Sequence, residues 1–306
     1  MIRVIIFVLF LVLLPLPSAI MRKMRDKRRA RWEPHGNLKK AKADYICDLP
    51  FGGNLCATYS RMREVGSGGE GNIIGSLLLV WYCMNQIDIL EEKYGGAVIY
   101  LRPANPNMPK GEASLYSMLM MAADLDGILR KGNLHKLARK RHSSISSWIV
   151  KYRLDGSRQL DDMGAYEVAL VKSNVSFGLH TRTGKRRQLS RKGQELTIRL
   201  LGFKRYLEDF TVINDREVRE ADMWKWYLVF AQLFGFADRL AKQFKRMDPA
   251  FFLRPDAKTT DILAVTSICN SFGDSMYNGY LYGVNVGDRS YLYRRRGRYS
   301  SAYRAR

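Results

Sequence analysis

Histidine and cysteine are scarce in this chain, and their scarcity narrows the chemistry that it can carry. The 306 residues include four His and four Cys. The histidines are scattered, and no Cys, Asp or Glu stands between His135 and His142. A metal site would therefore have to be assembled from residues far apart in sequence. We expect neither a metal nor any other cofactor.

The cysteines lack the C-x-x-C spacing that is typical of metal and redox sites. They are Cys47, Cys56, Cys83 and Cys269. We interpret all four as reduced thiols, with a disulfide between Cys47 and Cys56 as the alternative.

Motifs of catalysis are also lacking. The glycine-rich run at residues 66–71 is not followed by Gly-Lys-Ser/Thr and follows no predicted strand, so it predicts a loop that leads into a helix. No nucleophile elbow or dinucleotide fingerprint is present. Asp161 and Asp162 are adjacent in a predicted loop, where neighbouring side chains point apart. We predict that the chain is not an enzyme, and no small-molecule substrate is evident.

Acidic residues are few relative to basic residues. The chain has 51 Lys and Arg against 29 Asp and Glu, a formal net charge of +22. Such an excess favours polyanionic partners, either nucleic acid or the anionic cytoplasmic leaflet of a membrane. It carries no information about the fold.

Long apolar runs are absent from the polar connector predicted at residues 156–188, so the chain cannot span a membrane there. Residues 1–20 are almost wholly apolar, and the stretch 4–20 is at the short end for crossing the hydrocarbon layer. We predict a transmembrane anchor here, with a cleaved signal peptide or a buried core helix as alternatives. The basic run that follows indicates that the bulk of the chain is cytoplasmic.

The basic run after the apolar segment has two compatible interpretations. It is a topology signal, and it is also a patch suited to anionic lipid. Its residues are Arg22, Lys23, Arg25, Lys27, Arg28, Arg29 and Arg31.

Residues 189–252 carry the strongest helical periodicity. Leu200, Phe203 and Leu207 follow one another at helical spacing, and so do Trp224 and Leu228. This pattern predicts a helical hairpin with both apolar faces turned inward. Gly202 inside the first helix costs about 1 kcal/mol relative to Ala, which suggests close backbone packing there.

The same stretch carries a family resemblance. The segment Gly-Phe-Lys-Arg-Tyr-Leu contributes Gly202, Phe203, Tyr206 and Leu207, and an aromatic pair follows at residues 251–252. These motifs resemble the last cytoplasmic segment of the YciQ-like predicted bacterial membrane proteins, whose shared domain has no assigned function. The resemblance implies a membrane location more than a reaction. The family's large extracytoplasmic domain has no counterpart here, so a truncated or degenerate relative is a further interpretation.

The middle of the chain predicts small helical units that resemble winged helices. Residues 72–103 show an apolar helix followed by a β-hairpin, and residues 104–188 predict a second helical unit that ends in a polar connector. Between Asp126 and Asp155 there is no acid. A cluster in this interval is a candidate contact for nucleic acid or lipid: Lys136, Arg139, Lys140 and Arg141.

Residues 253–306 predict a turn-rich region and an Arg/Tyr-rich tail. The tail offers stacking and charge to single-stranded nucleic acid or to lipid headgroups through Arg294, Arg295, Arg296 and Arg298. The fold class expected is mainly α with minor β. Six segments are expected, namely 1–20 (transmembrane anchor), 21–71 (basic flank and loop), 72–103, 104–188, 189–252 and 253–306.

These observations favour a membrane-anchored, non-enzymatic scaffold or regulatory protein on the cytoplasmic face. Its partners would be the anionic lipid surface and an unidentified protein. The alternative is a membrane-tethered, winged-helix-like protein that binds nucleic acid through residues 130–141 and the tail.

Overall fold

The computed structural model describes residues 44–66, 69–91, 96–174, 181–210, 221–247 and 261–302. The chain forms two compact units. The larger unit joins residues 43–167 to residues 189–306, and the smaller contains residues 168–188. The described structure is mainly helical with two small sheets, as the sequence predicts.

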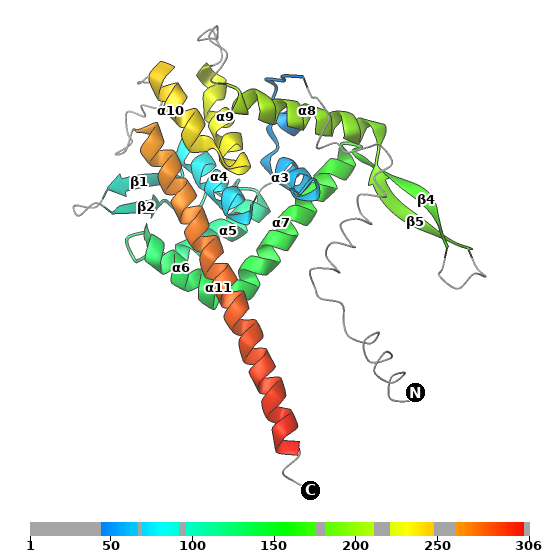
Figure 1. The fold of residues 1–306 in the computed structure, drawn as a ribbon. Helices are drawn as coiled ribbons and strands as arrows, with labels where there is room; N and C mark the ends of the chain where they lie inside the picture. The colour runs from blue at the N-terminus through cyan, green and yellow to red at the C-terminus, as the bar shows by residue number, and fades with distance from the viewer. Residues whose placement is uncertain are drawn as a thin grey trace, which may run out of the picture. The chain divides into compact units, whose positions relative to one another are not determined.

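The centre of the larger unit is helix α4, Glu70–Cys83 (Figure 1). Every residue from 73 to 82 is buried. A helix that is apolar on all sides is stable only when other elements surround it. Helices α9 (Ala221–Phe234) and α11 (Ile262–Ala302) both pack against α4. The helix predicted here is therefore confirmed, but it is buried all round and not on one face.

A small antiparallel sheet follows α4. Asn85 adopts a left-handed conformation at φ 58°, which asparagine tolerates, and turns the chain into strand β1, Ile87–Glu91. Strand β2 (Ala97–Leu101) pairs with β1 on one edge and with β3 (Ile128–Arg130) on the other. The register aligns Ile89, Ile99 and Leu129, and all three are fully buried. This row is the core face of the sheet.

Helix α3 (Leu55–Glu64) follows a short 3-10 helix, η2 (Pro50–Gly53), and packs along α7 (His142–Asp162). Its Arg61 is only 6% exposed. The Arg61 guanidinium donates a hydrogen bond of 2.8 Å to Thr197 Oγ1 and forms an ion pair of 2.8 Å with Glu64. The buried cation is thus paired on two sides, as burial requires.

Three further helices occupy the segment after the hairpin. They are α5 (Lys110–Met120), α6 (Lys131–Lys140) and α7 (His142–Asp162). The apolar residues that predict them are buried, among them Leu115, Leu134 and Trp148. The prediction of a polar connector from residue 156 onward was wrong in its first part, because α7 continues to Asp162. Asp161 and Asp162 therefore end a helix and do not lie in a loop.

The structure does not divide the middle of the chain as the sequence suggests. Strand β3, from the expected second unit, completes the sheet of the expected first unit, so residues 72–103 and 104–130 share one sheet. The later hairpin of β4 (Tyr166–Asn174) and β5 (Thr181–Leu189) is a separate two-stranded sheet. Winged-helix architecture is not established by this topology.

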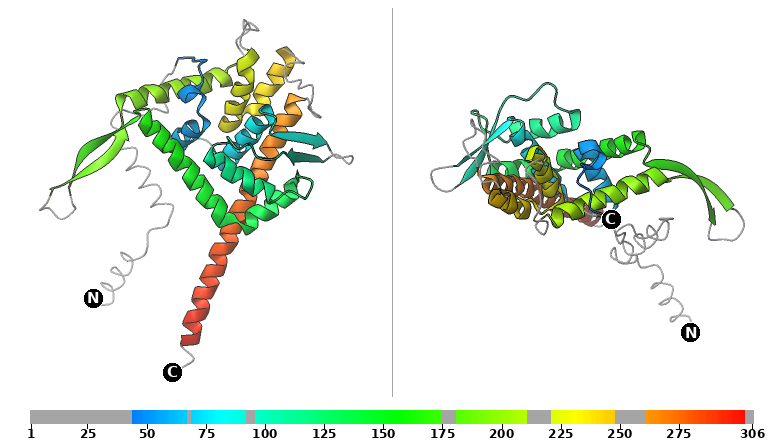
Figure 2. Two further views of the ribbon diagram at one scale, coloured as in Figure 1. Left: turned by 180° about the vertical axis from the view of Figure 1, so that it is seen from behind. Right: turned by 90° about the horizontal axis from the view of Figure 1, so that it is seen from above.

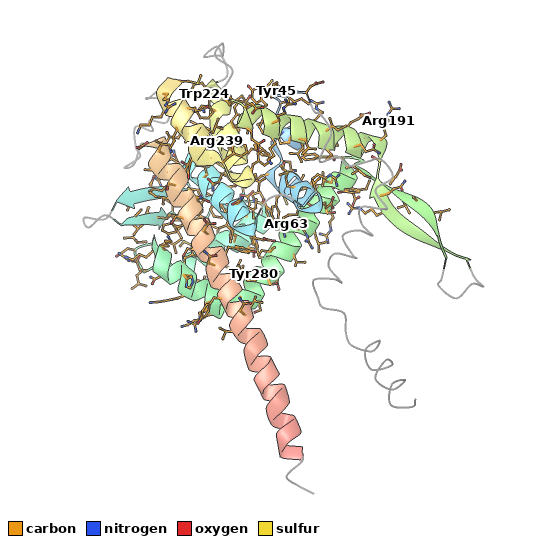
Figure 3. All side chains as sticks on the ribbon, in the orientation of Figure 1. Tyr45, Arg63, Arg191, Trp224, Arg239 and Tyr280 are labelled. Carbon is orange, nitrogen blue, oxygen red and sulfur yellow. The ribbon has the colours of Figure 1, made fainter. Side chains whose placement is uncertain are left out.

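The expected helical hairpin contains three helices. Helix α8 (Arg191–Glu208) is followed by α9, and Gly235, at φ +87°, then ends α9 before α10 (Ala237–Met247). The hairpin prediction implied one continuous second helix and was wrong on this point. The helix breaks at Gly235 because glycine adopts this left-handed conformation without strain. The apolar faces do turn inward: Trp224, labelled in Figure 3, stacks on Phe244 at 4.6 Å between ring centroids.

The carboxyl-side segment differs most from expectation. We predicted a turn-rich region with a short helix, but α11 runs unbroken from Ile262 to Ala302 (Figures 1 and 2). The glycines at 273, 279 and 283 each lie where α11 closely approaches another backbone. Tertiary packing thus overrides the weak helix propensity of glycine.

Among the described residues, no helix is long and apolar enough to span a membrane. The anchor expected at residues 1–20 lies outside the part of the chain that the structure describes. The four cysteines are free thiols, in agreement with the sequence interpretation.

Candidate functional site

The basic cluster found in the sequence lies on the surface of α6. Lys136, Arg139, Lys140 and Arg141 are all exposed. Leu134 and Ala138 on the same helix are fully buried. The helix is therefore amphipathic, with its apolar side in the core and its cations toward solvent.

Helix α11 crosses α6 directly beside this cluster. A Cβ placed on Gly279 would lie 2.5 Å from the His135 carbonyl oxygen, and one on Gly283 would lie 2.5 Å from that of Arg139. Real Cβ atoms do not approach so closely, so only glycine permits this crossing. The Arg139 guanidinium lies 4.4 Å from the ring centroid of Tyr282, at cation–π distance.

The crossing brings two distant parts of the sequence to one end of the unit. Beyond Gly283, α11 continues away from α6 and α7 toward Ala302 (Figures 1 and 2). Its backbone there includes Arg294, Arg295, Arg296 and Arg298, whose side chains the structure does not describe. We call the basic side chains of residues 136–141, together with α11 from residue 281 onward, the basic end.

Exposed apolar side chains accompany the cations at the basic end. Leu281, Tyr282 and Val286 are 38%, 48% and 43% exposed. Exposed apolar groups beside cations are typical of surfaces that meet other macromolecules or lipid. The sequence pattern predicts no helix over residues 281–286, so it could not assign these side chains to one face.

The other predicted site residues have different outcomes. The basic run of residues 22–31 lies outside the described residues. The family-like motif belongs to the core: Phe203 is fully buried, with Tyr227 and Phe230 at ring distances of 5.7 and 5.6 Å. Gly202 faces the Asp44 carbonyl oxygen too closely to admit a Cβ, which confirms the close packing expected. The motif residues therefore support the fold and do not form a binding surface.

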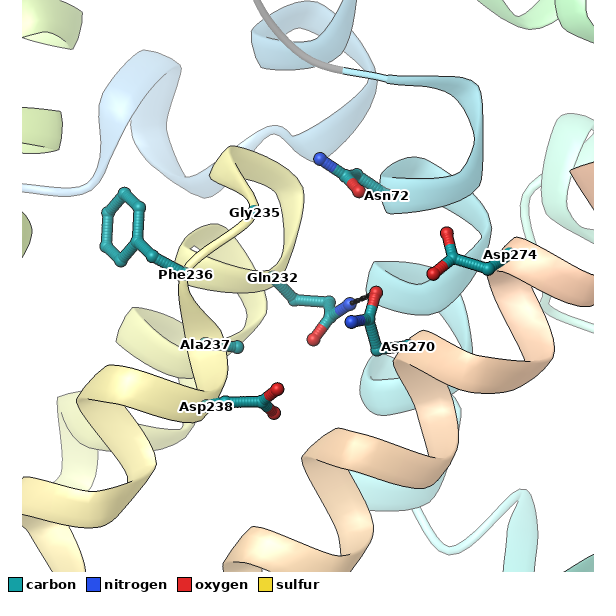
Figure 4. Close-up of a pocket in the computed structure, with 8 residues that line it drawn as sticks. All are labelled: Asn72, Gln232, Gly235, Phe236, Ala237, Asp238, Asn270 and Asp274. Atoms are coloured by element: carbon teal, nitrogen blue, oxygen red, sulfur yellow. Dashed lines mark hydrogen bonds between the residues drawn. The ribbon is translucent and has the colours of Figure 1, made fainter.

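Two polar cavities on α11 were not predicted from the sequence. The first, of about 170 Å³, is bounded by α4, α9, α10 and α11 (Figure 4). The second, of about 530 Å³, lies between α6 and α11. Asn270 and Asp274 line both cavities. No sequence motif could reveal them, because their residues come from elements up to about 200 positions apart.

Metal chemistry finds no support in the described part of the chain. No group of three or more His, Cys, Asp and Glu residues there is arranged to hold a metal ion. The absence of an enzymatic activity remains a prediction.

A helical protein with a basic, partly apolar end is thus the class that the fold defines. Residues 163–244 match the family model described as the C-terminal domain of a predicted membrane protein, DUF2207. This segment runs from just before β4 into α10, and the match confirms the family resemblance that the motif at residues 202–207 indicates. No curated protein and no solved structure matches the chain.

Proposed function

We propose that the chain is a non-enzymatic, membrane-associated scaffold or regulatory protein that holds its basic end against an anionic lipid surface. The observation that carries this proposal is the presence of exposed Leu281, Tyr282 and Val286 beside exposed Arg139 and its basic neighbours. Cations draw the surface to anionic headgroups, and apolar side chains enter the boundary beneath them.

The energetics favour lipid over a purely electrostatic partner. Each Lys or Arg near an anionic membrane contributes about 1 kcal/mol, so the four exposed cations of residues 136–141 supply several kcal/mol together. Phosphate backbones would use the same cations, but they make no use of exposed aliphatic groups. The family's description as a predicted membrane protein agrees with this preference.

The proposed orientation follows from the amino-terminal sequence. Residues 1–20 would anchor the chain, and the basic residues of 22–31 would remain on the cytoplasmic side. The described domain would then lie beside the leaflet that carries anionic lipid. Protease accessibility of a carboxyl-terminal tag in intact and lysed cells, with a carbonate wash of the membranes, tests this orientation. Cleavage of the tag in intact cells would contradict it.

The contact with lipid is tested by a fluorescent label at the basic end. The full chain carries Cys47→Ser and Ser143→Cys, is labelled with an environment-sensitive dye, and is reconstituted in vesicles. We expect emission to rise and shift to the blue in phosphatidylglycerol vesicles relative to phosphatidylcholine vesicles. The shift should reverse at about 1 M salt, where the Debye length is about 3 Å. The Cys47→Ser parent, labelled alike, supplies the background.

Matched variants locate the effect. Replacement of Arg139, Lys140 and Arg141 by Gln should abolish the anionic-lipid response. Replacement of Arg239, Lys242 and Arg246 by Gln removes the same charge from exposed positions on α10 and should leave the response intact. Figure 3 shows Arg239 well separated from Tyr280, which lies near α6. Equal responses of the two variants, or equal emission in both lipids, would refute the proposal.

A membrane-tethered nucleic-acid binder is the second candidate. It is favoured by the chain order β3–α6–α7–β4–β5, in which two helices separated by Arg141 alone precede a β-hairpin, as in winged-helix proteins. A binding assay with duplex DNA across a salt series tests it. Sequence-independent binding that disappears near physiological salt is only electrostatic. Base-specific retention at that salt would favour this candidate over lipid.

A further inference from the structure

The two polar cavities on α11 differ in charge, and this difference points to a ligand. The first contains Asp238 and Asp274 and no Lys, Arg or His. The second contains Lys131 and His135 from the start of α6. Since Asn270 and Asp274 belong to both, the cavities adjoin along one polar face of α11. A ligand lying along this face would meet acidic groups at one end and basic groups at the other.

The acidic cavity is built around a buried amide. Gln232 is only 2% exposed, and Figure 4 shows its side chain pointing into the cavity toward Asn270. Gln232 Nε2 donates a hydrogen bond of 3.1 Å to Asn270 Oδ1. No described residue donates to Gln232 Oε1, so this acceptor, on a side chain that is only 2% exposed, is open to the cavity. A ligand donor in this cavity would satisfy it.

The two carboxylates of the acidic cavity favour a ligand whose donor group is positively charged. Neither Asp238 nor Asp274 forms an ion pair with any described residue. An ammonium group has three donors and a positive charge, so it can meet Gln232 Oε1 and an aspartate at once.

The basic cavity suits an anion with three acceptor oxygens. Helix α6 begins at Lys131 without a side-chain cap, and Lys131 is the residue of its first turn that lines the cavity. Ser275 is 7% exposed and donates its hydroxyl proton to the Lys131 carbonyl oxygen at 3.1 Å, so it joins α11 to the start of α6 and is not a donor to the ligand. Lys131 and His135 add charged or polar donors, and free hydroxyl donors come from Ser267 and Ser271. So many donors exceed the needs of a carboxylate and match a phosphate.

We infer that the two cavities form one site for a small phosphorylated primary amine. The ammonium group lies between Gln232 Oε1 and the aspartates, and the phosphate lies at the start of α6. Asp274, at the boundary, repels a phosphate that lacks an ammonium group and so selects against inorganic phosphate. This ligand chemistry occurs both in free phosphoethanolamine and in the headgroup of phosphatidylethanolamine.

Calorimetric titration of the full-length chain in detergent with phosphoethanolamine tests the site. We expect saturable binding, with ethanolamine and inorganic phosphate each at least about tenfold weaker, because each lacks one charged end. Displacement by phosphatidylethanolamine vesicles, but not by phosphatidylcholine vesicles, would identify the lipid headgroup as the natural source. Absence of displacement would identify the free compound.

Two variants are distinguished by their effect on inorganic phosphate. Asp274→Asn should weaken the binding of phosphoethanolamine and strengthen the binding of inorganic phosphate. Lys131→Gln should weaken the binding of both. Asp162→Asn and Lys151→Gln make the same charge changes at exposed positions of α7 and should alter neither. Circular dichroism verifies that each variant is folded. Inorganic phosphate binding as tightly as phosphoethanolamine, or an Asp274→Asn variant with an unchanged preference, would overturn the inference.

Discussion

The Arg139 guanidinium on α6 lies over the ring of Tyr282 on α11, 4.4 Å from the ring centroid. The next residue along α11, Gly283, approaches the Arg139 backbone so closely that a Cβ would lie 2.5 Å from its carbonyl oxygen. One exposed contact and one buried contact therefore join the same two helices. They are expected to contribute very differently to stability.

Replacement of Gly283 by Ala should lower the free energy of unfolding by about 1–3 kcal/mol, because the added methyl forces α11 away from α6. Tyr282→Leu should cost at most about 1 kcal/mol, since an exposed cation–π contact is worth about 0.5–1 kcal/mol. Urea denaturation of the two variants measures both values. A larger loss for Tyr282→Leu than for Gly283→Ala would contradict this assignment.

Replacement of Gly202 by Ala should destabilise the protein by about 1–3 kcal/mol, although alanine is the better helix former. The reason is the Asp44 carbonyl oxygen, which occupies the space that the methyl needs. Gly132→Ala is the matched control on α6, where a Cβ meets nothing within 4 Å. That variant should gain up to about 1 kcal/mol. The unfolding temperature should therefore fall for Gly202→Ala and rise for Gly132→Ala.

Glu112 should make stability depend on pH. Burial raises the pKa of its carboxyl group, although Trp81 Nε1 donates a hydrogen bond of 3.2 Å to it. A carboxyl whose folded-state pKa exceeds its unfolded value, about 4.3, contributes stability below that value and loses it as pH rises through the folded pKa. Glu112→Gln removes this loss and keeps the acceptor for Trp81. The variant should thus exceed the parent in unfolding free energy at pH 7, with a smaller difference below pH 4.

The control for this pH dependence is Glu195→Gln on α8. The Glu195 side chain is 62% exposed, so its replacement should change the unfolding free energy by no more than about 0.5 kcal/mol at any pH. A constant difference between Glu112→Gln and the parent from pH 3 to pH 8 would show that Glu112 titrates normally.

The cysteines should react with N-ethylmaleimide in a fixed order. Cys47 is exposed, whereas burial raises the pKa of the Cys56 thiol to about 12 and also raises that of fully buried Cys269. Because the thiolate is the nucleophile, Cys47 should be modified first in the native protein at pH 8. Mass spectrometry after brief treatment measures this order. Cys47→Ser should lose the fast modification, and Cys269→Ala should keep it.

The sequence by itself determined which segments are helical wherever apolar residues recur at helical spacing. The buried faces of α5, α7 and α8, the hairpin of β1 and β2, and the close packing at Gly202 were all predictable. Each depends on neighbours within a few residues, or on one backbone position that needs glycine. The resemblance to a family of predicted membrane proteins was also recognisable from a short motif, because residues 202–207 lie in the core and form a continuous stretch of chain.

Only the tertiary structure decided what depends on distant partners. The length of α11 was not predictable, because its glycines weaken a helix locally and stabilise it only through close contact with α4 and α6. The pairing of Arg61 with Thr197 joins residues 136 positions apart. The basic end and the polar cavities arise in the same way, since α11 brings together residues whose positions in the chain carry no signal of proximity. Side-chain contacts across the core, and not local pattern, therefore create both proposed sites.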